Sequence, residues 1–306
     1  MRKNKSPKNC IRFILLLAST ALSATLFAQS WIIDNETALK RIAYFKQIKK
    51  PSLNILAGGS ELDSIVVPTN SFKKTMTDLL EVPGANGVIM YFISLPEELN
   101  KSGLRGSKLS IVCVPAYLNE RQNRRIDDKP LRAYYLGLDS LRKNVVYGSF
   151  KEIAKPGFNR SIRHFKRAYQ ANKLKALQKV LKSINDTTKE TRGIFYSAAI
   201  INSGVGEKSM LQYINGNKSV DEISIIYAAN INYDKYPHQL SLLFGLKDQY
   251  TALSAADIDR KLTELESKAL KDTVNASKYN DEINELRKKA ATYGDTGKPC
   301  PPLDCN

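Results

Sequence analysis

The sequence predicts an α+β protein built from two related modules, each running helix–strand–helix–strand–strand with antiparallel strand pairs, and a helical C-terminal tail. Three observations predict it. Apolar residues recur at helical spacing in several segments, short β-branched and aromatic runs alternate with those segments, and the order of elements repeats once along the chain. The length of 306 residues fits two domains of ordinary size.

The N-terminal segment has the order of an export signal: a cationic stretch, the apolar run Phe13–Phe27 and the small residue Ala28. We therefore expect residues 1–28 to be a signal peptide and the mature protein to act in the periplasm or outside the cell. The alternative is an uncleaved anchor in the inner membrane with the protein facing the periplasm, because the uncharged run Phe13–Ile33 is long enough to span a bilayer. No later segment is apolar enough to predict another membrane span.

The first module is expected over residues 31–150. A helix begins at Asp34 or Asn35 and ends at Pro51, because its apolar residues have helical spacing and proline interrupts a helix. The remaining predicted elements are a strand at Ile65–Pro68, a helix from Asn70 or Ser71 to Leu80, strands at Val88–Ser94 and Leu109–Pro115, and a weaker strand at Leu131–Leu136.

The second module is expected over residues 151–250, and it repeats the order of the first. It begins with a basic helix from about Ser161 to Ser183. Four pairs of residues then correspond at similar offsets: 129 for Ile65 and Ile194, 134 for Leu80 and Ile214, 135 for Val88 and Ile223, and 131 for Leu109 and Leu240. Offsets this constant predict an internal duplication. The alternative is two unrelated α+β segments that share an element order.

Residues 254–293 are predicted to be helical, because Ile258, Leu262 and Leu265 start a heptad pattern that resumes later in the segment. Asp272 and Ala276 interrupt the apolar seam, so the segment is either one long helix or a hairpin. We expect it to pack on the modules or on a partner helix, because a standalone coiled coil would need a stronger apolar seam.

The tail, residues 294–306, holds Cys300 and Cys305. In an oxidising compartment two cysteines this close around two prolines predict a disulfide. A redox pair or a metal site is the alternative, but redox pairs prefer Cys-x-x-Cys spacing and no other ligand is near.

Three local patterns together carry a resemblance: Pro83-Gly84-Ala85-Asn86-Gly87-Val88, the β-rich run Leu109–Val114, and Cys300-Pro301-Pro302 with Cys305. They resemble a group of small Bacteroidota proteins with a Pro-Gly-x-x-Gly-Val/Ile strand and a Cys-Pro-Pro-x-Cys end. The terminal spacing is one residue longer here, and Ala85 stands where that group often has cysteine. The resemblance implies a shared fold unit and no activity.

The basic helix is the main candidate binding surface, because no acid occurs between Glu152 and Asp186 and an apolar stripe lies opposite its charges. The candidate residues for contact with an anionic surface are Arg160, Arg163, Lys166, Arg167, Lys173, Lys175, Lys179 and Lys182. The alternative is an ordinary domain helix whose stripe lies in the core and whose charges are solvated.

The sequence contains no recognised catalytic motif, and its two histidines, His164 and His238, lie far apart along the chain. We therefore expect no metal and no cofactor, and an enzyme is the less favoured class. Removal of five cations with the leader lowers the formal net charge from +17 to +12, which favours anionic partners without indicating a specific nucleic acid.

The leading hypothesis for function is an exported non-catalytic binding or structural module. The alternatives are an exported hydrolase without a familiar motif, and a membrane or polyanion binder that uses residues 160–182. Another exported protein is a further class of partner.

Overall fold

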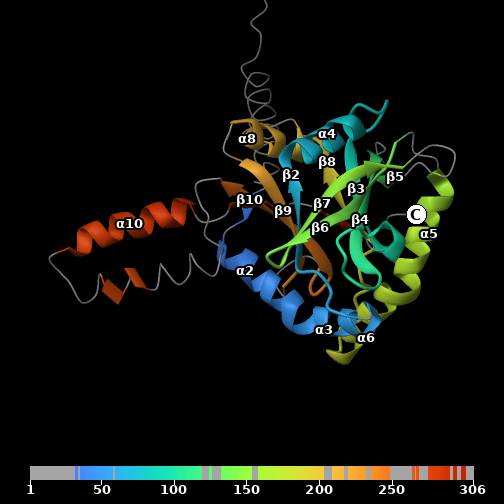
Figure 1. Ribbon diagram of the computed structural model, residues 1–306, viewed down its shortest axis with the longest axis horizontal. Helices are drawn as coiled ribbons and strands as arrows, with labels where there is room; N and C mark the ends of the chain where they lie inside the picture. The colour runs from blue at the N-terminus through green and yellow to red at the C-terminus, as the bar shows by residue number, and fades with distance from the viewer. Residues whose placement is uncertain are drawn as a thin grey trace, which may run out of the picture.

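The structure is a computed structural model of the chain (Figure 1). It describes residues 32–33, 35–57, 59–118, 124–125, 132–153, 158–202, 209–216, 220–231, 236–248, 264–265, 267–268, 275–289, 292–294 and 298–300. The predicted signal-peptide segment 1–28 therefore lies outside the described residues, as do Cys305 and the heptad residues Ile258 and Leu262.

Two helical stretches, α2–η1–α3 and α5–η4–α6, share an unusual feature: a five-residue π turn divides each one. The helices are α2 (Asn35–Tyr44), the π turn η1 (Phe45–Lys49), α3 (Lys50–Ala57), α4 (Thr69–Leu80), the 3-10 turn η2 (Glu97–Leu99), α5 (Phe158–Tyr169), the π turn η4 (Gln170–Leu174), α6 (Lys175–Ser183), α7 (Ala198–Ile201), α8 (Met210–Gly216) and α10 (Ala276–Lys289).

The strands form one sheet. They are β1 (Ile32–Ile33), β2 (Ser64–Pro68), β3 (Gly87–Leu95), β4 (Lys108–Leu118), β5 (Arg124–Arg125), β6 (Tyr134–Arg142), β7 (Val145–Glu152), β8 (Gly193–Ser197), β9 (Val220–Ala229), β10 (Leu240–Asp248), β11 (Thr292–Gly294) and β12 (Lys298–Cys300). Their order is β1-β11-β10-β9-β2-β7-β6-β4-β3-β8-β12, and β5 pairs with β4. The ladder between β2 and β7 is parallel and the others are antiparallel.

The eight strands from β10 to β8 form a mixed, nearly closed, barrel-like sheet. Its two ends are joined by side chains. The Glu190 carboxylate, just before β8, accepts a hydrogen bond from the amide of Leu240 at the start of β10 at 2.5 Å. The rings of Tyr196 in β8 and Phe244 in β10 meet edge to face with centroids 5.5 Å apart. The core therefore lies within one continuous sheet.

This architecture overturns the predicted α+β fold of two helix–strand modules. Strands dominate, and the two segments share one sheet instead of forming two: β2 of the first pairs with β9 of the second, and β3 of the first pairs with β8 of the second. The approach is close, since a Cβ on Gly87 would lie 2.6 Å from the Tyr196 carbonyl oxygen. The prediction was wrong because strand periodicity indicates which face of a strand is buried, but it does not indicate which other strand pairs with that strand.

Several individual elements are confirmed, among them β2, α4, β3, β4, the basic helix, β9 and β10. Two expectations were wrong. The first helix continues past Pro51, the second residue of α3, which directly follows the π turn, where the regular α-helical hydrogen bonding is already interrupted. The hairpin of β6 and β7 extends far beyond the predicted weak strand, and its turn residues Lys143 and Asn144 have φ of 47° and 65°.

Two buried ion pairs cross between the two halves of the chain at equivalent positions. Lys173 in η4 pairs with Glu61, just before β2, at 2.5 Å, and Lys49 in η1 pairs with Glu190, just before β8. These four side chains are at most 2% exposed. Glu61 also accepts the amide of Leu109, as Glu190 accepts that of Leu240. Each π turn thus supplies a lysine to the glutamate of the other half.

The C-terminal region adds a helix and two short strands, so the predicted helical tail is incomplete. In the described part of this region, α10 covers Ala276–Lys289, β11 pairs with β10, and β12 pairs with β8. Cys300 is the last residue of β12. Among the helices that the structure describes, none combines the length and apolarity that a membrane crossing needs.

Candidate anionic-surface binding face

Five cations are exposed on α5 and α6: Arg163, Arg167, Lys175, Lys179 and Lys182. They lie along one side of this helical stretch because of the π turn between the two helices. An α-helix advances about 100° per residue, so the exposed cations of an unbroken helix over 163–182 would spread over about 160°. A π turn inserts about one extra residue into the helix. This insertion brings the cations of α6 back into phase with those of α5, and the five then fall within a sector of about 60°.

The structure separates the eight predicted residues by their environments. Lys166 is half-buried, with its Nζ 3.9 Å from the centroid of the Tyr91 ring. Lys173 is buried in its pair with Glu61 and does not belong to the exposed face. Arg160 lies in the first turn of α5. Five residues are exposed and form what we call the basic stripe: Arg163, Arg167, Lys175, Lys179 and Lys182.

Within the described residues, no carboxylate forms an ion pair with a member of the basic stripe. Other exposed lysines differ: Lys40 pairs with Glu36 and Lys74 pairs with Asp78, each one helical turn away. In this part of the chain the stripe therefore presents positive charge to solvent, which attracts anions over about a Debye length.

The helix beside the stripe exposes apolar side chains. α3 packs against α6 along one edge of the molecule (Figure 1). Ile55 in α3 is 84% exposed, Leu56 is 44% exposed and Ile48 in η1 is 37% exposed. Sequence reasoning missed these residues, because Leu53 and Ala57 continue the same apolar pattern and are buried.

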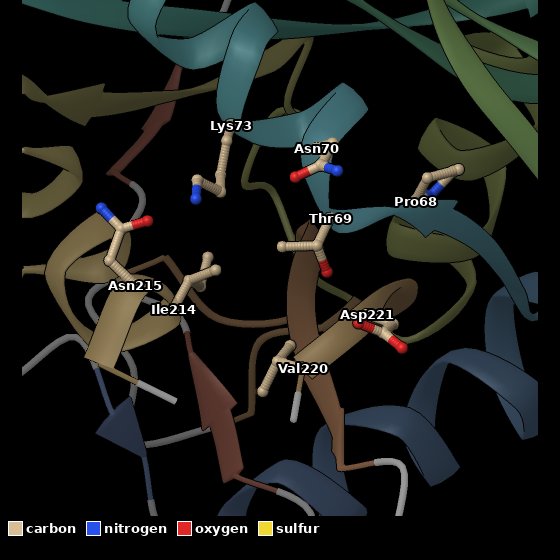
Figure 2. Close-up of a pocket in the computed structure, with 8 residues that line it drawn as sticks. All are labelled: Pro68, Thr69, Asn70, Lys73, Ile214, Asn215, Val220 and Asp221. Atoms are coloured by element: carbon tan, nitrogen blue, oxygen red, sulfur yellow. The ribbon is translucent and has the colours of Figure 1, made fainter. Parts of the chain in front are cut away.

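A separate pocket of about 380 Å³ lies where β2 ends and α4 begins (Figure 2). The side chains of Lys73 and Asn70 on α4 border it on one side and Asp221 on β9 on another. Its lining is completed by Pro68, Thr69, Ile214, Asn215 and Val220. Such a hollow suits a small polar molecule, and its described lining residues include no histidine or cysteine.

An aspartate–histidine pair lies at the other end of β9. His238 Nδ1 is 2.7 Å from Asp186 Oδ2, and the imidazole stacks on the Tyr44 ring at 5.0 Å. The backbone of His238 is left-handed, with φ of 61°. Burial acts to raise the pKa of Asp186, but hydrogen bonds from Thr188 and His238 outweigh it and lower the pKa. No pattern in the sequence indicated this pair, whose members lie 52 residues apart.

An oriented imidazole is one half of a hydrolase site, and the other half is a cavity for the substrate. Here the pocket and the imidazole are far apart. β9 begins at the pocket with Val220 and ends next to Asn230, whose carbonyl accepts the His238 amide. The ten residues of this strand span about 30 Å. The structure therefore does not bring this imidazole and this pocket together into one site.

The cysteines and possible metal ligands add no chemistry within the described residues. Cys113 is a buried free thiol in β4, and burial raises its pKa. No group of three or more His, Cys, Asp or Glu side chains suited to a metal ion occurs in the part of the chain that the structure describes.

Comparison of the chain with protein-family models, curated proteins and solved structures finds no match.

Proposed function

We propose that this protein is an exported, non-catalytic binding module that attaches to an anionic surface through the basic stripe. The observation that carries the proposal is the alignment of five exposed cations on one side of α5 and α6, none of them in an ion pair within the described residues. A helix that served the core alone would not need an outer face free of acids all the way from Glu152 to Asp186.

The energetics suit weak, reversible attachment. A lysine or arginine close to an anionic membrane contributes about 1 kcal/mol, so five contacts amount to about 5 kcal/mol. That free energy corresponds to a dissociation constant below about 1 mM, before the cost of ordering the side chains is subtracted. Attraction of this kind weakens as salt rises, because the exposed charges are screened.

The test is a charge-reversal variant, Arg167→Glu/Lys175→Glu/Lys179→Glu. We expect its affinity for phosphatidylglycerol vesicles and for heparin to fall by about 100-fold or more at low salt, since three favourable contacts become repulsive. The matched control, Lys101→Glu/Arg105→Glu/Lys143→Glu, makes the same change in net charge at exposed positions outside α5 and α6. Equal losses in the two variants, or no loss in the first, would contradict the proposal.

A further inference from the structure

Exposed apolar side chains occur close together along the stretch η1–α3. Ile48 lies in η1, seven residues before Ile55 in α3, and Leu56 directly follows Ile55. Single exposed apolar residues are common on protein surfaces. Three exposed apolar side chains within nine residues, one of them 84% exposed, are unfavourable in contact with water. We call Ile48, Ile55 and Leu56 the apolar ridge.

The apolar ridge lies beside the basic stripe. Because α3 packs against α6, the outward sides of these two helices are neighbours on the surface (Figure 1). The exposed cations of α6 are Lys175, Lys179 and Lys182. Ile184, directly after α6, is also 39% exposed. Apolar side chains bordered by lysines are the arrangement that interfacial helices use on anionic bilayers.

We propose that the apolar ridge inserts into the headgroup–acyl boundary of an anionic phospholipid bilayer while the basic stripe contacts the headgroups. This inference rests on the proposed function and names its partner: a lipid surface, which offers both negative charge and an apolar interior. A polysaccharide or a nucleic acid lacks such an interior. A second copy of the chain would bring like-charged lysines together around the ridge, which disfavours self-association at this face.

The experiment compares Ile55→Ser/Leu56→Ser with a matched control, Leu141→Ser/Val145→Ser. The control removes two exposed apolar side chains, 43% and 37% exposed, from the β6–β7 hairpin. Binding is measured by co-sedimentation with vesicles of phosphatidylcholine that contain a minor fraction of phosphatidylglycerol, at low and at high salt. Retention on heparin is measured in parallel.

We expect the ridge variant to bind vesicles about 10- to 100-fold more weakly than the wild type, to lose the binding that survives high salt, and to keep its heparin retention. The control should match the wild type in all three measurements. Circular dichroism of both variants establishes that they are folded, which is expected because the replaced side chains are exposed.

The outcomes separate the two proposals. If the ridge variant binds vesicles as the wild type does, while charge reversal of the stripe abolishes binding, the membrane inference is overturned and the proposed function stands. Heparin binding without any vesicle binding by the wild type leads to the same conclusion. If neither variant changes binding to either partner, both proposals are overturned. A wild-type dimer that the ridge substitution converts to a monomer would show that the ridge is a contact between copies, which overturns the inference.

Discussion

Lys108 and Gln239 occupy equivalent positions in the two halves of the barrel-like sheet. Each comes directly before a leucine whose amide is bound by a buried glutamate. Each side chain donates a hydrogen bond to the carbonyl of the residue before that glutamate: Lys108 to Ser60 at 3.1 Å, and Gln239 to Lys189. The same contact is thus made by a buried cation in one half and by a neutral amide in the other.

The first prediction follows from this equivalence. Burial lowers the pKa of Lys108, and the nearby charge of Lys173 lowers it further, against the opposing charges of Glu61 and Glu97. Lys108→Gln keeps a donor and removes a buried cation, so we expect its free energy of unfolding at pH 7 to be at least that of the wild type.

The pH dependence provides an independent check on Lys108. Between the lowered pKa of the folded state and the ordinary value of 10.5, the unfolded chain binds more protons at Lys108 than the folded one. The free energy of unfolding of the wild type should therefore rise with pH in that window, and Lys108→Gln should lack this part of the rise. Urea unfolding at pH 7 and pH 10 measures the free energy of unfolding of the wild type and of the Gln variant. The control is Lys108→Met, which has no hydrogen-bond donor. A Gln variant clearly less stable than the wild type at pH 7 would contradict the prediction.

The second prediction concerns the two buried glutamates. Removing one charge of a buried pair leaves the other uncompensated and costs about 3–5 kcal/mol. Both Glu61→Gln and Glu190→Gln should lower the free energy of unfolding by about this amount. Glu61→Gln should cost more, because it leaves Lys108 as well as Lys173 near the site. Urea unfolding measures the difference, with exposed Glu81→Gln as the control; an equal or smaller cost for Glu61→Gln would contradict the argument.

The third prediction concerns acid stability at the pair of Asp186 and His238. A carboxyl group with a lowered pKa in the folded state stabilises the protein above its ordinary pKa of 3.8, and this contribution is lost as pH falls through the folded value. Asp186→Asn should therefore be less stable than the wild type at pH 6, and the gap should close as pH falls below 3.8. Urea unfolding between pH 6 and pH 3 measures it, with exposed Asp221→Asn as the control. A gap that persists undiminished at pH 3 would mean that the carboxylate charge is not responsible.

The fourth prediction concerns the tail. If the leader is removed and Cys300 bonds to Cys305, protein purified from the periplasm should show one reactive thiol in denaturant, that of Cys113, and three after reduction. In the native state Cys113 should react slowly, because it is buried in β4 and burial raises its pKa. Three thiols before reduction would contradict the disulfide.

Local patterns in the sequence predicted most of the secondary structure and little of its assembly. β3 and β4 were found because their runs of β-branched and aromatic residues are long and are bounded by turn residues. Only the start of β6 was predicted, as the weak strand Leu131–Leu136, and β7 was missed, because many positions of this hairpin are polar and its turn lacks the Asn-Gly signal. The pairing of β2 with β9 joins segments from opposite halves of the chain, and nothing local encodes it.

The candidate site was predicted in part, for the same physical reason. The acid-free run identified the five exposed cations, but it also included Lys173, whose partner Glu61 lies 112 residues earlier in the sequence. Ile55 was not found, since exposure on the outer side of α3 depends on which side packs against α6. The equivalent contacts of Glu61 and Glu190 match the offsets seen in the sequence, and the duplication itself stays a prediction.

The two seams between the halves, β2 with β9 and β3 with β8, have a consequence for the order in which the molecule is completed. The ribosome finishes β2 and β3 long before it makes β9 and β8, the strands that flank them. Until then each has an unsatisfied edge, and loop closure over such distances is slow. The five strands of the first segment, β2, β7, β6, β4 and β3, are contiguous in the sheet, so they can pair before the second segment exists, but both edges of that half-sheet stay open until β8 and β9 are made.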